Sequence, residues 1–137
     1  MHLNGSGCQR CRLPKGEQKI QKVLKDLELR FEQQYSFLDC RYKSPLPFDF
    51  RVINNNSQFL IEFNGEQHYR PVKFGGLDDN TADNTFEQVK KRDEVKKDYA
   101  VKNGIPLLII RYDETDRILE LIKEFLNFNK SEINQST

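Results

Sequence analysis

The stretch "FDFRVINNNSQFLIEF", Phe48 to Phe63, contains two apolar-rich runs separated by "NNNS". Aromatic and β-branched residues favour strands, and the polar residues between the runs favour a tight turn. We therefore expect a β-hairpin with strands near "FDFRVI" and "QFLIEF". A polar segment, "NGEQHY", follows the second strand and carries several side chains that can bind ligands or metals.

The segments on either side of the hairpin add three helices and two strands. Apolar residues recur there at helical spacing or in short strand-like runs. In chain order we expect a helix at 15–29, a strand at 31–37, a turn at 43–47, the hairpin, a long polar loop at 70–84, a helix at 85–103 ending at Gly104, an apolar strand in "IPLLIIRY", and a helix at 115–128. This order, α-β-β-β-α-β-α, predicts an α/β fold of the α+β-like kind. The expected four-stranded mixed sheet has helices on both faces and "IPLLIIRY" at its centre.

The composition predicts one soluble domain. The 137 residues suffice for a single core, and hydrophobic residues make up 36% of the chain against 31% charged residues. No apolar run of about 18 residues exists, so we expect no membrane span. The N-terminus lacks the apolar segment of a signal peptide, which favours a cytoplasmic location. We expect a leader at 1–14, the domain at 15–129 and a frayed tail at 130–137.

Two of the three cysteines form a C-x-x-C pair in the leader, Cys8 and Cys11. A structural zinc site needs four ligands, and His2 is the single further candidate nearby. The pair is therefore half of a zinc site completed elsewhere, a relic of a zinc ribbon, or a reducible disulfide. We do not expect zinc binding by this chain alone. Cys40 is most simply a small buried residue.

The net charge of +1 neither indicates nor excludes nucleic acid as a partner. Basic residues cluster in "KGEQKIQKVLKDLELR", residues 15–30, and in "VKKRDEVKKDYAVK", residues 89–102. Such clusters are either solvated helix faces or surfaces that contact phosphate groups.

Two acidic residues stand among apolar residues of the hairpin strands. Asp49 lies between Phe48 and Phe50, which alternation puts together on the opposite face of the strand. Glu62 is likewise separated from its apolar neighbours on the next strand. If the register turns both polar faces the same way, the carboxylates of Asp49 and Glu62 come close together.

Three further residues suggest a site. Asp93 falls within the apolar stripe of its helix, and a buried carboxylate needs a partner such as histidine, a metal or Lys97 one turn on. Glu17 projects from the inner edge of the first helical turn, although acids also favour helix starts for electrostatic reasons. His68 is the one histidine outside the leader, and histidine exchanges protons near neutral pH.

Paired carboxylates on adjacent strands suit a hard cation such as Mg²⁺, and a histidine base beside them suits phosphodiester hydrolysis. Glycoside hydrolysis also uses paired carboxylates, but it gives Asp93 and His68 no role, and the chain lacks tryptophan for stacking on sugars. A zinc hydrolase would have more histidines.

The motifs "KGEQKI", "LPFDFRV", "IEFNGEQHY", "FGG" and "QVKKRDEVKKDYAVKNGIPLLIIRY", within residues 8–113, together resemble the PD-(D/E)XK nuclease superfamily. The resemblance is to the branch related to the very-short-patch mismatch repair endonuclease, which includes phage homing endonucleases. That branch carries the pattern Glu, Asp, x, His, Asp. It implies a restriction-endonuclease-like core and a Mg²⁺- or Mn²⁺-dependent endodeoxyribonuclease from a bacterial or phage-infected cell.

The resemblance implies roles for the five pattern residues. Asp49 is the main metal ligand, Glu62 completes the metal site, and Glu17 binds a water on the metal or a second metal. His68 is the general base or assists the leaving group, and Asp93 orients it. The superfamily's motif lysine falls at position 64, where this chain has asparagine, so His68 takes over its role.

The resemblance also implies double-stranded DNA as the partner. We assign substrate contacts to Asn64, Gln67, Lys90 and Lys97. The chain forms a homodimer or is fused to a separate DNA-binding domain in this interpretation. The alternatives are a catalytically inactive nuclease-fold module that binds nucleic acid or another partner, and a structural domain of a phage or viral particle.

Overall fold

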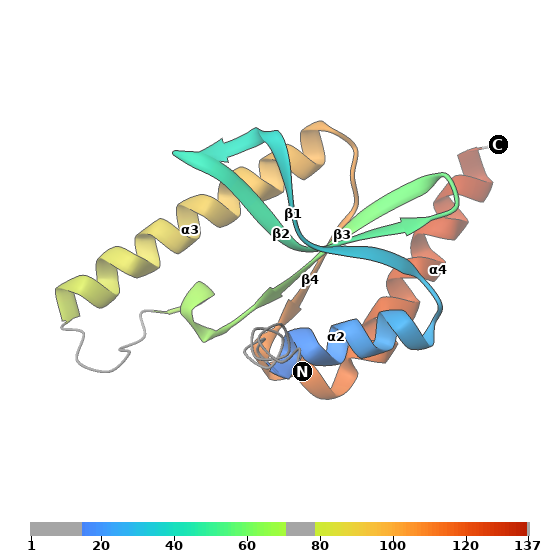
Figure 1. Cartoon of the computed structure of the whole chain (residues 1–137), viewed down its shortest axis with the longest axis horizontal. Coiled ribbons are helices and arrows are strands. Elements are labelled where there is room, and N and C mark those ends of the chain that lie inside the picture. The colour runs from blue at the N-terminus through green and yellow to red at the C-terminus, as the bar shows by residue number, and fades with distance from the viewer. Residues whose placement is uncertain (1–14, 71–78, 137) are drawn as a thin grey trace, which may run out of the picture.

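The computed structural model describes residues 15–70 and 79–136, with side chains for 15–70 and 85–128. In chain order this part of the molecule consists of α2 (Lys15–Asp26), β1 (Arg30–Tyr42), β2 (Ser44–Asn54), β3 (Ser57–Asn64), the 3₁₀ helix η1 (Glu66–His68), α3 (Asp79–Lys102), β4 (Leu107–Arg111), the 3₁₀ helix η2 (Tyr112–Arg117) and α4 (Ile118–Ser136) (Figure 1). The predicted order of helices and strands is confirmed.

The four strands form one sheet in the order β1-β2-β3-β4. The first three strands are antiparallel, and β4 runs parallel to β3, so the sheet is mixed as predicted. The tight turn of the β2–β3 hairpin lies within "NNNS", where Asn55 has a φ of 58°. Asparagine tolerates this left-handed conformation better than most residues do.

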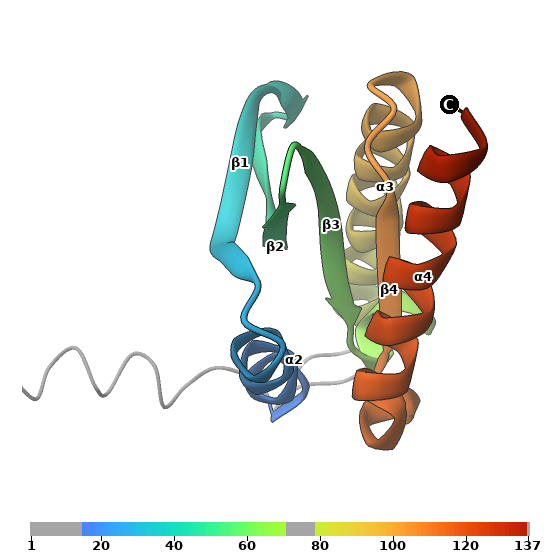
Figure 2. The same ribbon diagram turned by 90° about the vertical axis from the view of Figure 1, so that its right-hand side faces the viewer.

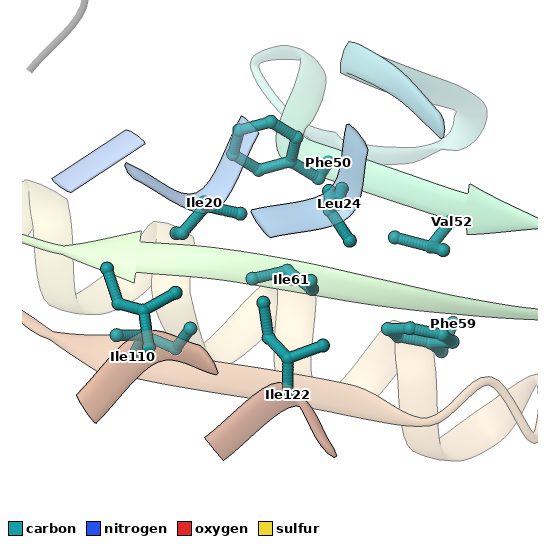
Figure 3. Packing of buried hydrophobic residues seen from close by; sticks show 9 residues of the cluster. Ile20, Leu24, Phe50, Val52, Phe59, Ile61, Ile110 and Ile122 are labelled. Atoms are coloured by element: carbon teal, nitrogen blue, oxygen red, sulfur yellow. The ribbon is translucent and has the colours of Figure 1, made fainter. Parts of the chain in front are cut away.

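Helices cover both faces of the sheet. On one face α2 and α4 pack against Phe50, Ile61 and Ile110, as Figure 3 shows. On the other face Ala100 of α3 packs against Leu60 of β3. Figure 2 shows α3 and α4 on opposite sides of β4. The two apolar clusters together form the core.

β4 lies at an edge of the sheet, so its predicted central position was wrong. Its apolar composition has a different cause. Leu108 and Ile110 face the cluster with α2 and α4, whereas Leu107 faces the cluster with α3. Because helices cover both faces of this edge strand, its sequence is as apolar as that of a central strand.

The turn predicted at 43–47 is confirmed only at Lys43, because β2 begins at Ser44 and continues through the rest of the segment. The chain reverses at Lys43, whose φ is 69°. Pairing between β2 and β3 extends only from Phe50 to Asn54, so residues 44–49 have no partner on that side. Pro45 and Pro47, which lack an amide hydrogen, are compatible with this unpaired side. We call residues 35–48 the hairpin arm.

The hairpin arm packs against α3. The ring centroids of Phe37 and Tyr99 lie 5.1 Å apart, and the Tyr99 hydroxyl donates a hydrogen bond to Asp39. Phe48 belongs to this α3 cluster, whereas Phe50 belongs to the cluster with α2 and α4. The expectation that both phenylalanines pack on the same face of the sheet was therefore wrong. The unpaired part of β2 leans toward α3 instead of following β3.

Several helix ends differ from the expected ones. α2 ends at Asp26, three residues earlier than expected, and α3 begins at Asp79 rather than at 85. The sequence "DNTADN" is rich in residues that favour helix starts. α4 extends to Ser136, so the predicted frayed tail is largely helical. Gly104, with a φ of +66°, ends α3 as predicted.

The leader, with Cys8 and Cys11, lies outside the described residues, as do residues 71–78 of the predicted loop. Among the helices of the described part, none is long and apolar enough to cross a membrane.

Candidate active site

Asp49 and Glu62 meet where the β2–β3 ladder stops. The Phe63 amide donates a hydrogen bond of 2.8 Å to Asp49 Oδ2. The Asp49 amide donates one of 3.3 Å to Glu62 Oε2. Side-chain carboxylates thus accept backbone hydrogen bonds just beyond the last strand pair, Phe50 and Ile61. The predicted proximity of the two acids is confirmed.

Glu17 joins this pair from the first turn of α2. The helix start approaches β3 closely because residue 16 is glycine: a Cβ there would lie 2.2 Å from the Phe63 ring. Glu17 is 8% exposed, and its Oε1 has no hydrogen-bond partner among the described residues. Burial, and secondarily repulsion from Asp49, raises the pKa of Glu17 to about 7, against an opposing effect of Lys96.

Lys96 of α3 contributes the cation of this group, and its Nζ contacts Glu62 Oε1. Burial, followed by repulsion from Asp49, raises the pKa of Glu62 despite this contact. The sequence predictions missed Lys96 and selected Lys97. The two lysines follow Asp93 by three and four residues, so helical spacing brings both to its side of the helix and does not choose between them.

His68 and Asp93 form the second pair of the site. His68 closes η1, and its Nδ1 lies 2.7 Å from Asp93 Oδ2. Their side chains are 19% and 18% exposed. The predicted meeting of these residues is confirmed. Lys97, the alternative partner of Asp93, is exposed, and among the described residues the ion pair of Asp93 is with His68 and not with Lys97.

A cleft of about 450 Å³ opens between the hairpin arm, η1 and α3. Asp49 reaches it from β2, His68 from η1, and Asp93 and Lys96 from α3. Within the described residues, its lining consists of Gln34, Tyr42, Lys43, Ser44, Pro45, Leu46, Pro47, Asp49, Gln67, His68, Val89, Arg92, Asp93 and Lys96. Glu17 and Glu62 are not part of the lining; both are buried beside Asp49. One carboxylate of the acidic group and the histidine pair thus line the same cleft, together with basic side chains.

The four predicted substrate contacts are placed differently from one another. Gln67 lines the cleft. Lys90 and Lys97 are exposed on α3 outside its lining. Asn64 is buried, and its amide donates a hydrogen bond to the Tyr69 hydroxyl. The roles of these residues in substrate binding stay predictions.

The acidic group has the chemistry of a site for a hard cation. Within the described residues, no three or more His, Cys, Asp or Glu side chains form a ready-made metal cage. Mg²⁺, however, keeps several waters and is usually held by one or two protein carboxylates. Asp49 and Glu62 supply such a pair, and the unpartnered Oε1 of Glu17 adds an acceptor beside them.

The chain was compared with protein-family models, with curated proteins and with solved structures, and none of them matched. The function is therefore inferred from the geometry of the cleft and the chemistry of its side chains.

Proposed function

We propose that this chain is a Mg²⁺- or Mn²⁺-dependent endonuclease that hydrolyses phosphodiester bonds in double-stranded DNA, on a restriction-endonuclease-like core. One observation carries the proposal: Asp49, with Glu62 behind it, and the His68–Asp93 pair come from separate segments and meet at one cleft. An acidic cation site and a histidine base are the two parts that this hydrolysis requires.

Asp49 and Glu62 would hold the divalent cation, with Glu17 beside them. The cation supplies activation of water and neutralisation of charge that builds up on the phosphate. Glu62 and Glu17 are buried next to Asp49, so packing restrains both side chains, and Glu62 Oε2 also accepts the hydrogen bond of the Asp49 amide. Such fixed acceptors favour a bound cation over freely moving surface acids.

His68 accepts the proton of the attacking water in the proposed reaction. With its Nδ1 proton donated to Asp93, the histidine presents its Nε2 as a base for the attacking water. The Asp93 carboxylate fixes this tautomer and stabilises the imidazolium that forms. The leaving oxygen departs on the side of the phosphorus opposite the attacking water, so it takes its proton from solvent, and the imidazolium releases its own proton to solvent. Other histidine-based hydrolases assign the same roles to a histidine and its carboxylate.

Basic side chains position the substrate. Lys43 at the tip of the hairpin arm and Arg92 on α3 line the cleft together with Lys96. Cations on both walls suit a phosphate backbone lying between them. Exposed Lys90 and Lys97 extend the basic surface of α3 beyond the cleft.

A double-mutant cycle on His68 and Asp93 tests the proposal. Single-turnover cleavage of a DNA duplex with saturating Mg²⁺ is measured for wild type, His68→Ala, Asp93→Asn and the double variant. We expect each single variant to lose about 100-fold or more in rate, as for a general base. The double variant should be little slower than either, because the two residues act as a unit.

Glu94→Gln provides the matched control, because Glu94 is the exposed neighbour of Asp93 on α3. It should cleave at the wild-type rate. Additive losses in the double variant would show that Asp93 does not act through His68. A wild-type protein that cleaves no DNA duplex with Mg²⁺ or Mn²⁺ would refute the proposed function.

A further inference from the structure

Lys96 lies in an unusual place for a lysine. It comes from the middle of α3, its side chain is only 15% exposed, and its Nζ contacts Glu62 Oε1. The Nζ also lies 5.4 Å from the centroid of the Phe48 ring. Burying an ammonium group this far is costly unless a carboxylate compensates it. The Glu62 carboxylate is the direct partner that compensates the buried charge of Lys96.

The charges around Lys96 are strongly unbalanced. Glu17 and Glu62 both lie close to Asp49, and Lys96 acts electrostatically on both glutamates. The other side chain that bonds Asp49 is the neutral amide of Gln34, at 3.5 Å. Within the described residues, Lys96 is thus the cation that contacts this group of three acids.

Strand β3 carries no lysine that could pair with Glu62 in place of Lys96. A lysine at position 64 would project from the strand that carries Glu62, but this chain has Asn64, which is buried and bonded to Tyr69. Lys96 reaches Glu62 from α3 instead, and it also lines the cleft. Its long, flexible stem allows the ammonium to move between Glu62 and the open cleft.

We propose that Lys96 is an internal cation that competes with the divalent metal for Glu62 and, once displaced, contacts the substrate phosphate. A divalent cation held by Asp49 and Glu62 neutralises the negative charge that Lys96 neutralises when no metal is bound. The displaced ammonium then remains in the cleft, where a phosphate is its natural partner. The phosphate contact rests on the proposed function, whereas the competition for Glu62 does not.

The competition is tested by titrating the full chain with Mn²⁺ in the absence of DNA, using isothermal titration calorimetry. Lys96→Gln should bind Mn²⁺ at least about fivefold more tightly than wild type, because a repelling charge beside the metal site is gone. Lys123→Gln, which removes an exposed lysine on α4, should bind as wild type does. Lys96→Arg, which keeps the charge, should not gain affinity.

Equal Mn²⁺ affinity for Lys96→Gln and Lys123→Gln would overturn the competition, as would an absence of Mn²⁺ binding in both wild type and Lys96→Gln. If Lys96→Gln is unfolded by circular dichroism, Mn²⁺ should restore its fold by occupying the acidic group. Failure of Mn²⁺ to do so would likewise overturn the inference.

The phosphate contact is tested by cleavage of a DNA duplex at saturating Mn²⁺. Lys96→Gln should cleave about 100-fold more slowly than wild type despite its tighter metal binding. A wild-type rate in Lys96→Gln would overturn the contact. If Lys96→Gln binds Mn²⁺ more tightly but wild type cleaves no DNA, the proposed function and the phosphate contact fail, and the internal cation stands.

Discussion

At the scale of single residues, Glu17 combines features that rarely occur together. It is buried, one of its oxygens lacks a hydrogen bond among the described residues, and it lies close to the Asp49 carboxylate. Its pKa of about 7 lies well above the usual value near 4.5. The folded state therefore holds a proton on Glu17 that the unfolded state releases as the pH rises from about 4.5 to 7.

This raised pKa predicts a pH-dependent stability. Without metal, the free energy of unfolding should fall as the pH rises through this window, by about 2 kcal/mol from Glu17. Glu17→Gln, which resembles the protonated side chain, should remove that part of the fall. Chemical denaturation at about pH 5 and about pH 8 measures both slopes.

The control for this measurement is Glu124→Gln, which changes an exposed acid on α4 and should keep the wild-type slope. A Glu17→Gln protein whose stability falls as steeply as that of wild type would show that Glu17 already carries its charge in the folded state.

The sequence identifies residues of this site where a local rule is broken. Asp49 and Glu62 are acids among strand residues that are otherwise apolar, and both were found at the site. Asp93 was found because it interrupts an apolar helical stripe. Lys96 breaks no such rule, since lysine is ordinary on a helix. Its role depends on the distance between α3 and β3, which periodicity does not determine.

At the scale of secondary-structure elements, the start of α2 controls the position of Glu17. Gly16 is buried against the Phe63 ring and leaves no room for a side chain. Phe63 in turn follows Glu62 and donates its amide hydrogen to Asp49. Displacing the helix start from β3 therefore disturbs all three acids.

We expect Gly16→Ala to destabilise the protein by about 1–3 kcal/mol through overpacking. The surviving folded protein should also cleave DNA more slowly, because Glu17 is displaced. Lys19→Ala, an exposed change on the same helix, should affect neither property. Thermal denaturation and a cleavage rate per folded molecule measure the two effects. Wild-type values for Gly16→Ala would show that the helix start has room to shift without disturbing the acids.

In this chain, sequence patterns predict which helices and strands form better than they predict which of these pair or pack together. The hairpin at "NNNS" and the helix end at Gly104 rest on local turn chemistry, and both were confirmed. Residues 44–47 belong to β2 but were predicted as part of a turn because their two prolines suggest a break. The edge position of β4 was missed because an apolar strand covered by two helices resembles a central strand.

At the scale of the whole molecule, the basic side chains lie around an acidic centre. Lys43 and Arg92 flank the cleft, while the acids lie at or behind its wall. The net charge of +1 conceals this arrangement, because the two sets of charges cancel. Only the folded arrangement separates them into a basic rim and an acidic site.

Affinity for a DNA duplex should therefore depend strongly on salt. Two phosphate contacts, from Lys43 and Arg92, predict a loss of affinity of about tenfold between 50 and 200 mM salt. Fluorescence anisotropy in EDTA measures this binding without cleavage. Lys43→Gln should flatten the dependence, whereas Lys123→Gln should not. An affinity that does not change with salt would contradict a basic rim that contacts phosphate groups.

The central claim is that Asp49 holds a metal that the cleft uses to hydrolyse DNA. Cleavage of supercoiled plasmid by wild type and Asp49→Asn, with Mg²⁺ and with EDTA, tests it most directly. The asparagine oxygen still accepts the hydrogen bond from the Phe63 amide, so the fold should persist. We predict that wild type cleaves with Mg²⁺ and not with EDTA, and that folded Asp49→Asn does not cleave. Cleavage by Asp49→Asn at the wild-type rate, or intact plasmid with wild type and Mg²⁺, would contradict the claim.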